Sequence, residues 1–134
     1  MTLVLAVFLA AHGLMHVSYL TPAPPRTADR PPWPFDLGRS RLTTALGVDP
    51  AVVRRLGIPL VAATIGLFLA SALATLGWLP ASWWSALVVG GASTSLVTLM
   101  LFFHPWLVLG IAIDAILLWA VRAAGWVPLT AHGA

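Results

Sequence analysis

Two histidines near the N-terminus and one aspartate near the C-terminus are the residues of this chain that could do chemistry in an apolar environment. His12 and His16 are one helical turn apart, and Asp114 is the only acidic residue in the C-terminal half. All three lie in long apolar segments, where a charge costs at least about 2.5–3.5 kcal/mol. An imidazole paired with a carboxylate satisfies both groups, and the pair is nearly neutral when it shares a proton. We therefore predict that His12, His16 and Asp114 form an intramembrane polar site.

Two interpretations of this site remain open. It is either a protonatable site that relays protons or holds a small or lipid-like ligand, or a polar clamp that fixes how two helices dock. The substitution Asp114→Asn separates them, because an amide still forms hydrogen bonds but cannot relay a proton. A clamp should tolerate asparagine, whereas a relay should stop.

The spacing of His12 and His16 is also that of a histidine pair on one face of a metal-binding helix. A third ligand would have to be Asp114 or His104, and a haem would require His16 and His104 on opposing helices. Four histidines are too few for a di-iron histidine box, and the chain has no cysteine. We expect no metal and no cofactor, and we interpret His104, with the following Pro105, as a helix start.

The composition defines the elements that must position these side chains. Of the 134 residues, 60% are hydrophobic and 8% are charged, whereas soluble domains contain about 25% charged residues. This balance predicts a single all-α domain over residues 1–134, an integral membrane four-transmembrane-helix bundle. The positive charge is entirely arginine, and we interpret it as a topology signal of the lipid bilayer rather than as nucleic-acid binding.

Four apolar runs are long enough to cross the bilayer. We expect spans at about 2–20, 56–78, 83–103 and 106–124, with a cytoplasmic loop at 21–55. A cleaved signal peptide is the alternative for the first run, but this run is long and no Lys or Arg precedes it.

Short connections should make the second and third spans antiparallel neighbours. Small residues recur at every fourth position in both spans and would allow their backbones to approach closely. The predicted stripes are Ala62, Gly66, Ala70 and Ala74 in the second span, and Ala86, Gly90, Thr94 and Thr98 in the third.

Helix start signals also occur in the loop. Asp49 followed by Pro50 is an N-cap with proline at the first helical position. Asp36 could cap a short interfacial helix that ends before Gly47.

The arginines of the loop predict the orientation. Six of the seven lie between residues 21 and 56, so the positive-inside rule places this loop in the cytoplasm and both termini outside. Arg39, Ser40 and Arg41 could contact lipid phosphate, although arginines that simply neutralise headgroups are the plainer interpretation. The predicted location is a bacterial inner (plasma) membrane, with the chain passing through it several times.

The segment His12-Gly13-Leu14-Met15-His16 with Tyr19-Leu20 resembles the HGLxH signature at the start of many small bacterial four-span membrane proteins. The segments Pro34-Phe35-Asp36 and Ser40-Arg41-Leu42 are similar to that group as well. In size and span number these proteins are broadly DoxX-like, and some DoxX-like members are linked to quinone or thiol redox systems. The resemblance implies an alternative function, a membrane redox or lipid-modifying enzyme subunit that uses quinone or metal. It is also compatible with a homo-oligomer or an accessory subunit of a membrane complex.

Overall fold

The computed structural model describes residues 2–22, 24, 33–38, 40 and 45–128, and these residues form helices and connecting turns without strands. Four helices are long and apolar enough to cross a membrane. They are α1 (Thr2–Met15), α3 (Pro50–Thr75), α4 (Trp84–Leu101) and α5 (Val108–Arg122). Short 3₁₀ turns extend α1 (η1, His16–Tyr19) and precede α4 (η2, Ala81–Trp83) and α5 (η3, Pro105–Leu107). The fold is therefore the expected four-helix membrane bundle.

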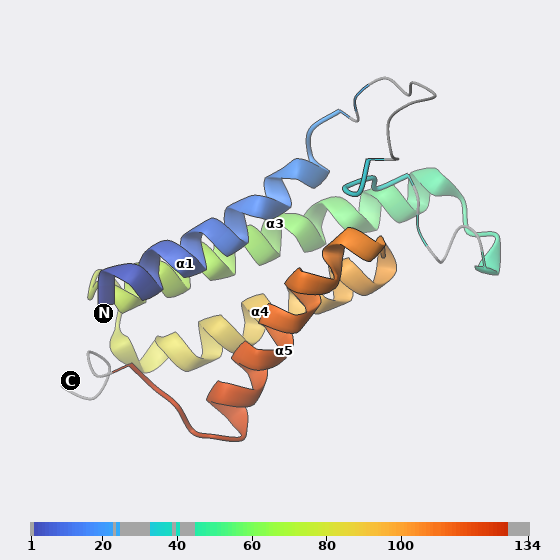
Figure 1. The fold of residues 1–134 in the computed structure, drawn as a ribbon. Coiled ribbons are helices and arrows are strands. Elements are labelled where there is room, and N and C mark those ends of the chain that lie inside the picture. Colours follow the sequence, from blue (N-terminus) through green and yellow to red (C-terminus); the bar gives the residue numbers. More distant parts are fainter. Residues whose placement is uncertain (1, 23, 25–32, 39, 41–44, 129–134) are drawn as a thin grey trace.

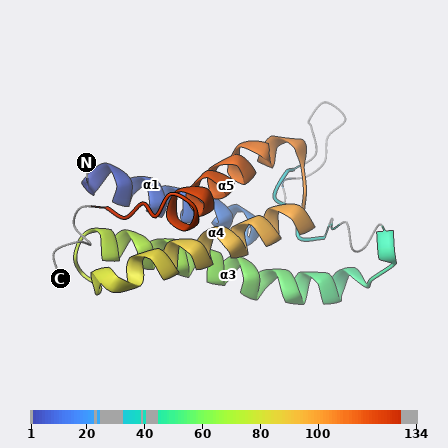
Figure 2. The same ribbon diagram turned by 90° about the horizontal axis from the view of Figure 1, so that it is seen from below.

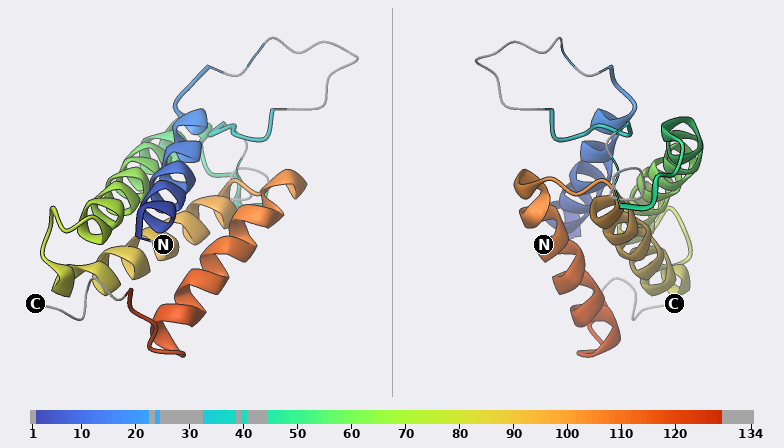
Figure 3. Two further views of the ribbon diagram at one scale, coloured as in Figure 1. Left: turned by 60° about the vertical axis from the view of Figure 1, so that its left-hand side comes forward. Right: turned by 90° about the vertical axis from the view of Figure 1, so that its right-hand side faces the viewer.

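The helices pack in chain order. α1 packs along α3, α3 along α4, and α4 along α5. Figure 2 shows α1 and α5 on the same side of the α3–α4 pair, and Figure 3 shows the same arrangement from two further directions. α5 is inclined to the other helices (Figure 1). The fourth side of the bundle, between α1 and α5, is therefore closed by side chains rather than by close backbone packing.

α3 begins earlier than the predicted span. The Asp49 side chain accepts a hydrogen bond of 2.6 Å from the backbone N–H of Ala51, and Pro50 occupies the first turn, where a missing N–H costs nothing. The helix then continues through Pro59. Residues 39 and 41–44 of the short helix predicted from Asp36 lie outside the described part of the chain.

The predicted stripe of small residues on α3 was wrong at Ala62 and Gly66, which are exposed, whereas Ala74 at its end is buried. The α3–α4 hairpin is present. Gly66 is exposed, and a Cβ added there would meet nothing within 4 Å. The face toward α4 instead carries Thr64 and Phe68, and the Phe68 ring lies 3.3 Å from a Cβ built on Gly91. A spacing of four residues drifts around a helix of 3.6 residues per turn, so a long stripe cannot stay on one contact face.

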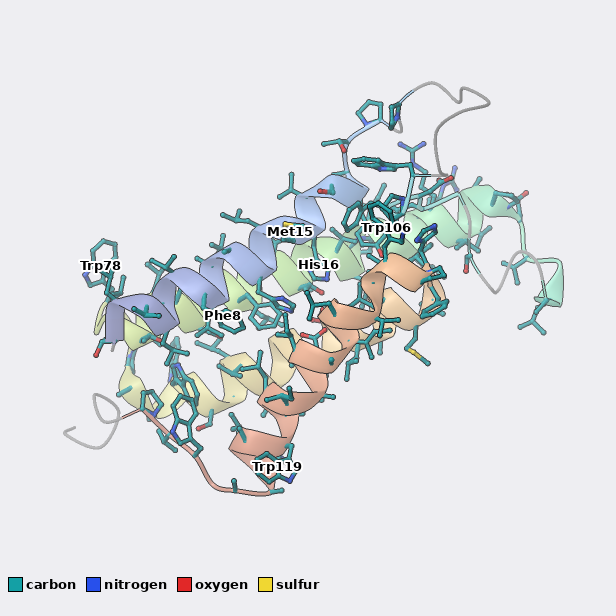
Figure 4. All side chains as sticks on the ribbon, in the orientation of Figure 1. Phe8, Met15, His16, Trp78, Trp106 and Trp119 are labelled. Carbon is teal, nitrogen blue, oxygen red and sulfur yellow. The ribbon has the colours of Figure 1, made fainter. Side chains whose placement is uncertain are left out.

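The buried apolar side chains form two clusters. One contains Leu9, Phe68, Trp84 and Leu117 among others, and the second contains Tyr19, Val61, Leu99 and Leu107 among others. On α1, α4 and α5 the residues between these clusters include His12, Ser95 and Asp114. Large apolar side chains such as Trp78 and Trp119 are exposed on the outside of the bundle (Figure 4). A surface this apolar matches lipid rather than water.

Candidate functional site

The His12 and Asp114 side chains meet in the bundle interior. His12 Nε2 lies 2.8 Å from Asp114 Oδ1, across the fourth side of the bundle from α1 to α5. Asp114 is fully buried, and His12 is 9% exposed. The structure thus brings together His12 and Asp114, two of the three residues predicted to form the intramembrane polar site.

Ser95 of α4 connects this pair to the second histidine. Its Oγ lies 2.5 Å from Asp114 Oδ2 and 3.0 Å from His16 Nε2. His16 Nδ1 in turn lies 3.3 Å from the backbone carbonyl oxygen of His12. The result is a continuous chain of hydrogen bonds, His12–Asp114–Ser95–His16, which we call the polar network.

Ser95 was not among the predicted site residues. A serine in an apolar helix is uninformative alone, because its hydroxyl can donate to a carbonyl of its own helix. The signal that could have found it is depth. Ser95 lies about midway along α4, at the level where α1 carries His12 and α5 carries Asp114.

Aromatic rings hold the His12 imidazole in place. The Phe68 and His12 rings form a T-shaped pair with centroids 4.9 Å apart, and Phe8 stacks on His12 at 6.2 Å. The His16 and His12 rings form a second T-shaped pair at 5.8 Å. Gly13 allows this arrangement, because a Cβ there would lie 2.7 Å from Cβ of Phe68. The close approach of α1 to α3 therefore sets the position of the imidazole relative to Asp114.

The geometry of the polar network permits two arrangements of one proton. The Ser95 hydroxyl has a single hydrogen, so it can donate to Asp114 or to His16 but not to both. In the first arrangement Ser95 donates to an ionised Asp114 carboxylate, and a protonated His16 donates from Nε2 to Ser95. In the second, a protonated Asp114 donates to Ser95, and Ser95 donates to Nε2 of a neutral His16.

Exchange between these two arrangements would involve no net change of charge. The proton on His16 Nε2 would move to Ser95 Oγ while the Ser95 proton moved to Asp114 Oδ2, so an imidazolium–carboxylate pair would become two neutral groups. His12 donates from Nε2 to Asp114 Oδ1 in both. Since no step creates an unpaired charge, the exchange suits a site buried inside the bilayer.

A pocket of about 180 Å³ lies beside the polar network, between α1 and the start of α5. His12 and His16 line it together with the aromatic rings of Phe35 and Trp106. Met15 also lines it and is 57% exposed, and Trp106 is 72% exposed. Figure 4 shows Met15 and His16 near the end of α1 and Trp106 at the start of α5. The pocket therefore opens sideways, toward the surface that faces lipid.

The remaining predicted residues lie elsewhere. His104 precedes η3, and its Nδ1 accepts a bond of 3.3 Å from the backbone N–H of Trp106, which agrees with a helix start. Arg39 and Arg41 lie outside the described residues, and Ser40 is buried. The lipid-phosphate contact stays a prediction. Within the described part of the chain, no three His, Cys, Asp or Glu side chains cluster as a metal site would require.

Comparison with known proteins gives no further assignment. A scan against protein-family models and searches of curated proteins and solved structures each return no match. The fold itself defines the class, a multi-pass helical membrane protein with a buried histidine–aspartate pair. The DoxX-like resemblance stays a prediction.

Proposed function

We propose that this protein takes up and passes on protons inside the membrane through the polar network. The observation that carries the proposal is the unbroken hydrogen-bond chain His12–Asp114–Ser95–His16, whose geometry satisfies two arrangements of one proton. A clamp would need only one arrangement. Ionisable residues inside membrane spans are rare, and they mark ion pathways and proton relays in many membrane proteins.

The test is an infrared pH titration of the purified protein in nanodiscs. Asp114 is the only carboxyl side chain in the membrane spans, since the other three aspartates lie in the 21–55 loop. We expect a protonated-carboxyl band that grows on acidification, shifts in heavy water, and disappears in Asp114→Asn. Identical difference spectra from the two proteins would contradict the proposal.

The pocket favours a second, compatible role, which is to bind a small or lipid-like ligand beside the network. The alternative of a redox or lipid-modifying enzyme subunit that uses quinone or metal would use the same residues and stays a prediction. So does assembly as a homo-oligomer or as an accessory subunit.

We further propose that the protein lies in a bacterial inner membrane with the 21–55 loop in the cytoplasm and both termini outside. The arginines of that loop support this orientation. Residues 126–128 share a pocket with the start of α1, so the two ends of the described chain lie on one side. Because the chain has no cysteine, single cysteines report the topology cleanly. An impermeant maleimide should label Ala123→Cys but not Leu46→Cys in intact spheroplasts, and the reverse pattern would overturn the orientation.

A further inference from the structure

The polar network uses only one of the two nitrogens of the His12 ring. Nε2 faces Asp114, and no hydrogen bond joins Nδ1 to any described residue. Among the described side chains, only Tyr19 and Trp33 carry a fully enclosed polar atom without a partner. His12 Nδ1 is therefore not fully enclosed, and the ring lines the pocket between α1 and α5.

The chemistry of Asp114 fixes what Nδ1 can do. Toward His12, Asp114 Oδ1 accepts in both arrangements of the network, so Nε2 carries the hydrogen. A neutral imidazole with hydrogen on Nε2 has a lone pair on Nδ1 and accepts a hydrogen bond there. For a neutral His12, the group that completes the site would therefore bring an O–H or N–H donor, whereas a protonated imidazole would itself donate from Nδ1.

The walls of the pocket restrict the size and the polarity of the rest of the ligand. Phe35, Trp106, Leu99 and Ile113 surround the space with aromatic and aliphatic atoms. An apolar cavity of about 150 Å³ accommodates benzene, so the volume of about 180 Å³ fits one small substituted ring. Because the exposed rim faces lipid, such a molecule would enter from the bilayer.

We propose that this pocket binds a lipid-soluble phenol or alcohol whose hydroxyl donates a hydrogen bond to His12 Nδ1. The proposal rests on the proposed function in one respect, because Asp114 must accept a hydrogen bond from His12 Nε2 so that the hydrogen stays on this nitrogen. It does not need the Ser95 step, because Ser95 contacts Asp114 Oδ2 and not His12.

The test compares para-cresol with its methyl ether, para-methylanisole, on protein with ¹⁵N-labelled histidine in nanodiscs. The two probes match in shape, but only the phenol donates a hydrogen bond. We expect para-cresol to shift the His12 Nδ1 resonance and to bind about tenfold more tightly than the ether, the effect of one net hydrogen bond. Equal binding of the two probes, or no shift of His12 with either, would overturn the proposal.

Two variants separate specific binding from partition into lipid and from the proposed function. Ile113→Phe fills the pocket and should remove the shifts, and shifts that persist would show that the probes act from the lipid. Ser95→Ala should keep para-cresol binding while it stops proton exchange. If wild-type Asp114 titrates but para-cresol does not bind, the ligand proposal alone fails. If para-cresol binds but Asp114 never titrates, the proton proposal alone fails.

Discussion

Replacing Asp114 with asparagine should freeze the polar network without unfolding the bundle. In Asp114→Asn the amide oxygen can accept from His12 Nε2, and the amide NH₂ can donate to Ser95 Oγ. Ser95 then donates to His16 Nε2, and His16 Nδ1 donates to the His12 carbonyl. Asparagine thus reproduces the arrangement in which Asp114 is protonated, and it lacks the mobile proton.

The expected stability change follows from the number of bonds kept. All of the hydrogen bonds survive and only the second amide N–H lacks an acceptor, so the free energy of unfolding should fall by no more than about 1 kcal/mol, the lower end of the cost of one unpaired donor. Asp114→Ala removes the carboxylate, so His12 Nε2 loses its acceptor and Ser95 Oγ keeps only His16 Nε2 as a partner. Interhelical hydrogen bonds in membranes average about 0.6 kcal/mol, with a maximum of about 1.7, so the alanine variant should lose about 1–3 kcal/mol.

Reversible unfolding in mixed micelles, followed by circular dichroism, measures both variants under one condition. The reasoning requires the order wild type, Asp114→Asn, Asp114→Ala, with the asparagine variant close to wild type. An asparagine variant as unstable as the alanine variant would refute it, because the amide would then not fit the network.

Two further predictions use matched pairs of variants. Ser95→Ala leaves His16 Nε2 and one Asp114 oxygen unpaired, and it should cost about 1–3 kcal/mol in the same unfolding assay. The control is Ser71→Ala. The Ser71 hydroxyl is equally buried but donates only to a carbonyl of its own helix, so its loss should cost less than about 0.5 kcal/mol. Equal effects of the two substitutions would refute the role of Ser95. Gly13→Ala forces a contact of 2.7 Å with Phe68 and should destabilise by about 1–3 kcal/mol. Gly66→Ala meets no neighbour and should be neutral or stabilising by up to about 1 kcal/mol; a tolerated Gly13→Ala would show that α1 does not pack closely on α3.

Depth along the spans was enough to predict the central contact of the site. His12 and Asp114 each lie near the middle of an apolar run, and burial of either alone is costly. Two ionisable side chains at one level of a small bundle offset the cost of their burial by pairing with each other. The four spans themselves followed from length and hydrophobicity, which the bilayer thickness constrains tightly.

Rotation about each helix axis was not predictable in the same way. Which face of α3 meets α4 depends on the fit of large side chains such as Phe68 against Gly91, and the regular spacing of Gly66 did not reveal it. Ser95 was missed for the same reason, since its role depends on the face that α4 turns toward α1 and α5. Pairwise packing across the bundle sets these rotations, and a single sequence does not record it.

The protonation of His16 Nε2 tests the shared proton most directly. ¹⁵N NMR of labelled histidine in nanodiscs distinguishes a ring nitrogen that carries hydrogen from one that does not. We predict that the wild-type Nε2 resonance lies between these limits, because the proton exchanges through Ser95. In Asp114→Asn it should move to the unprotonated limit, because Ser95 can then only donate to it. An Nε2 resonance that is the same in both proteins would contradict the proposed proton exchange.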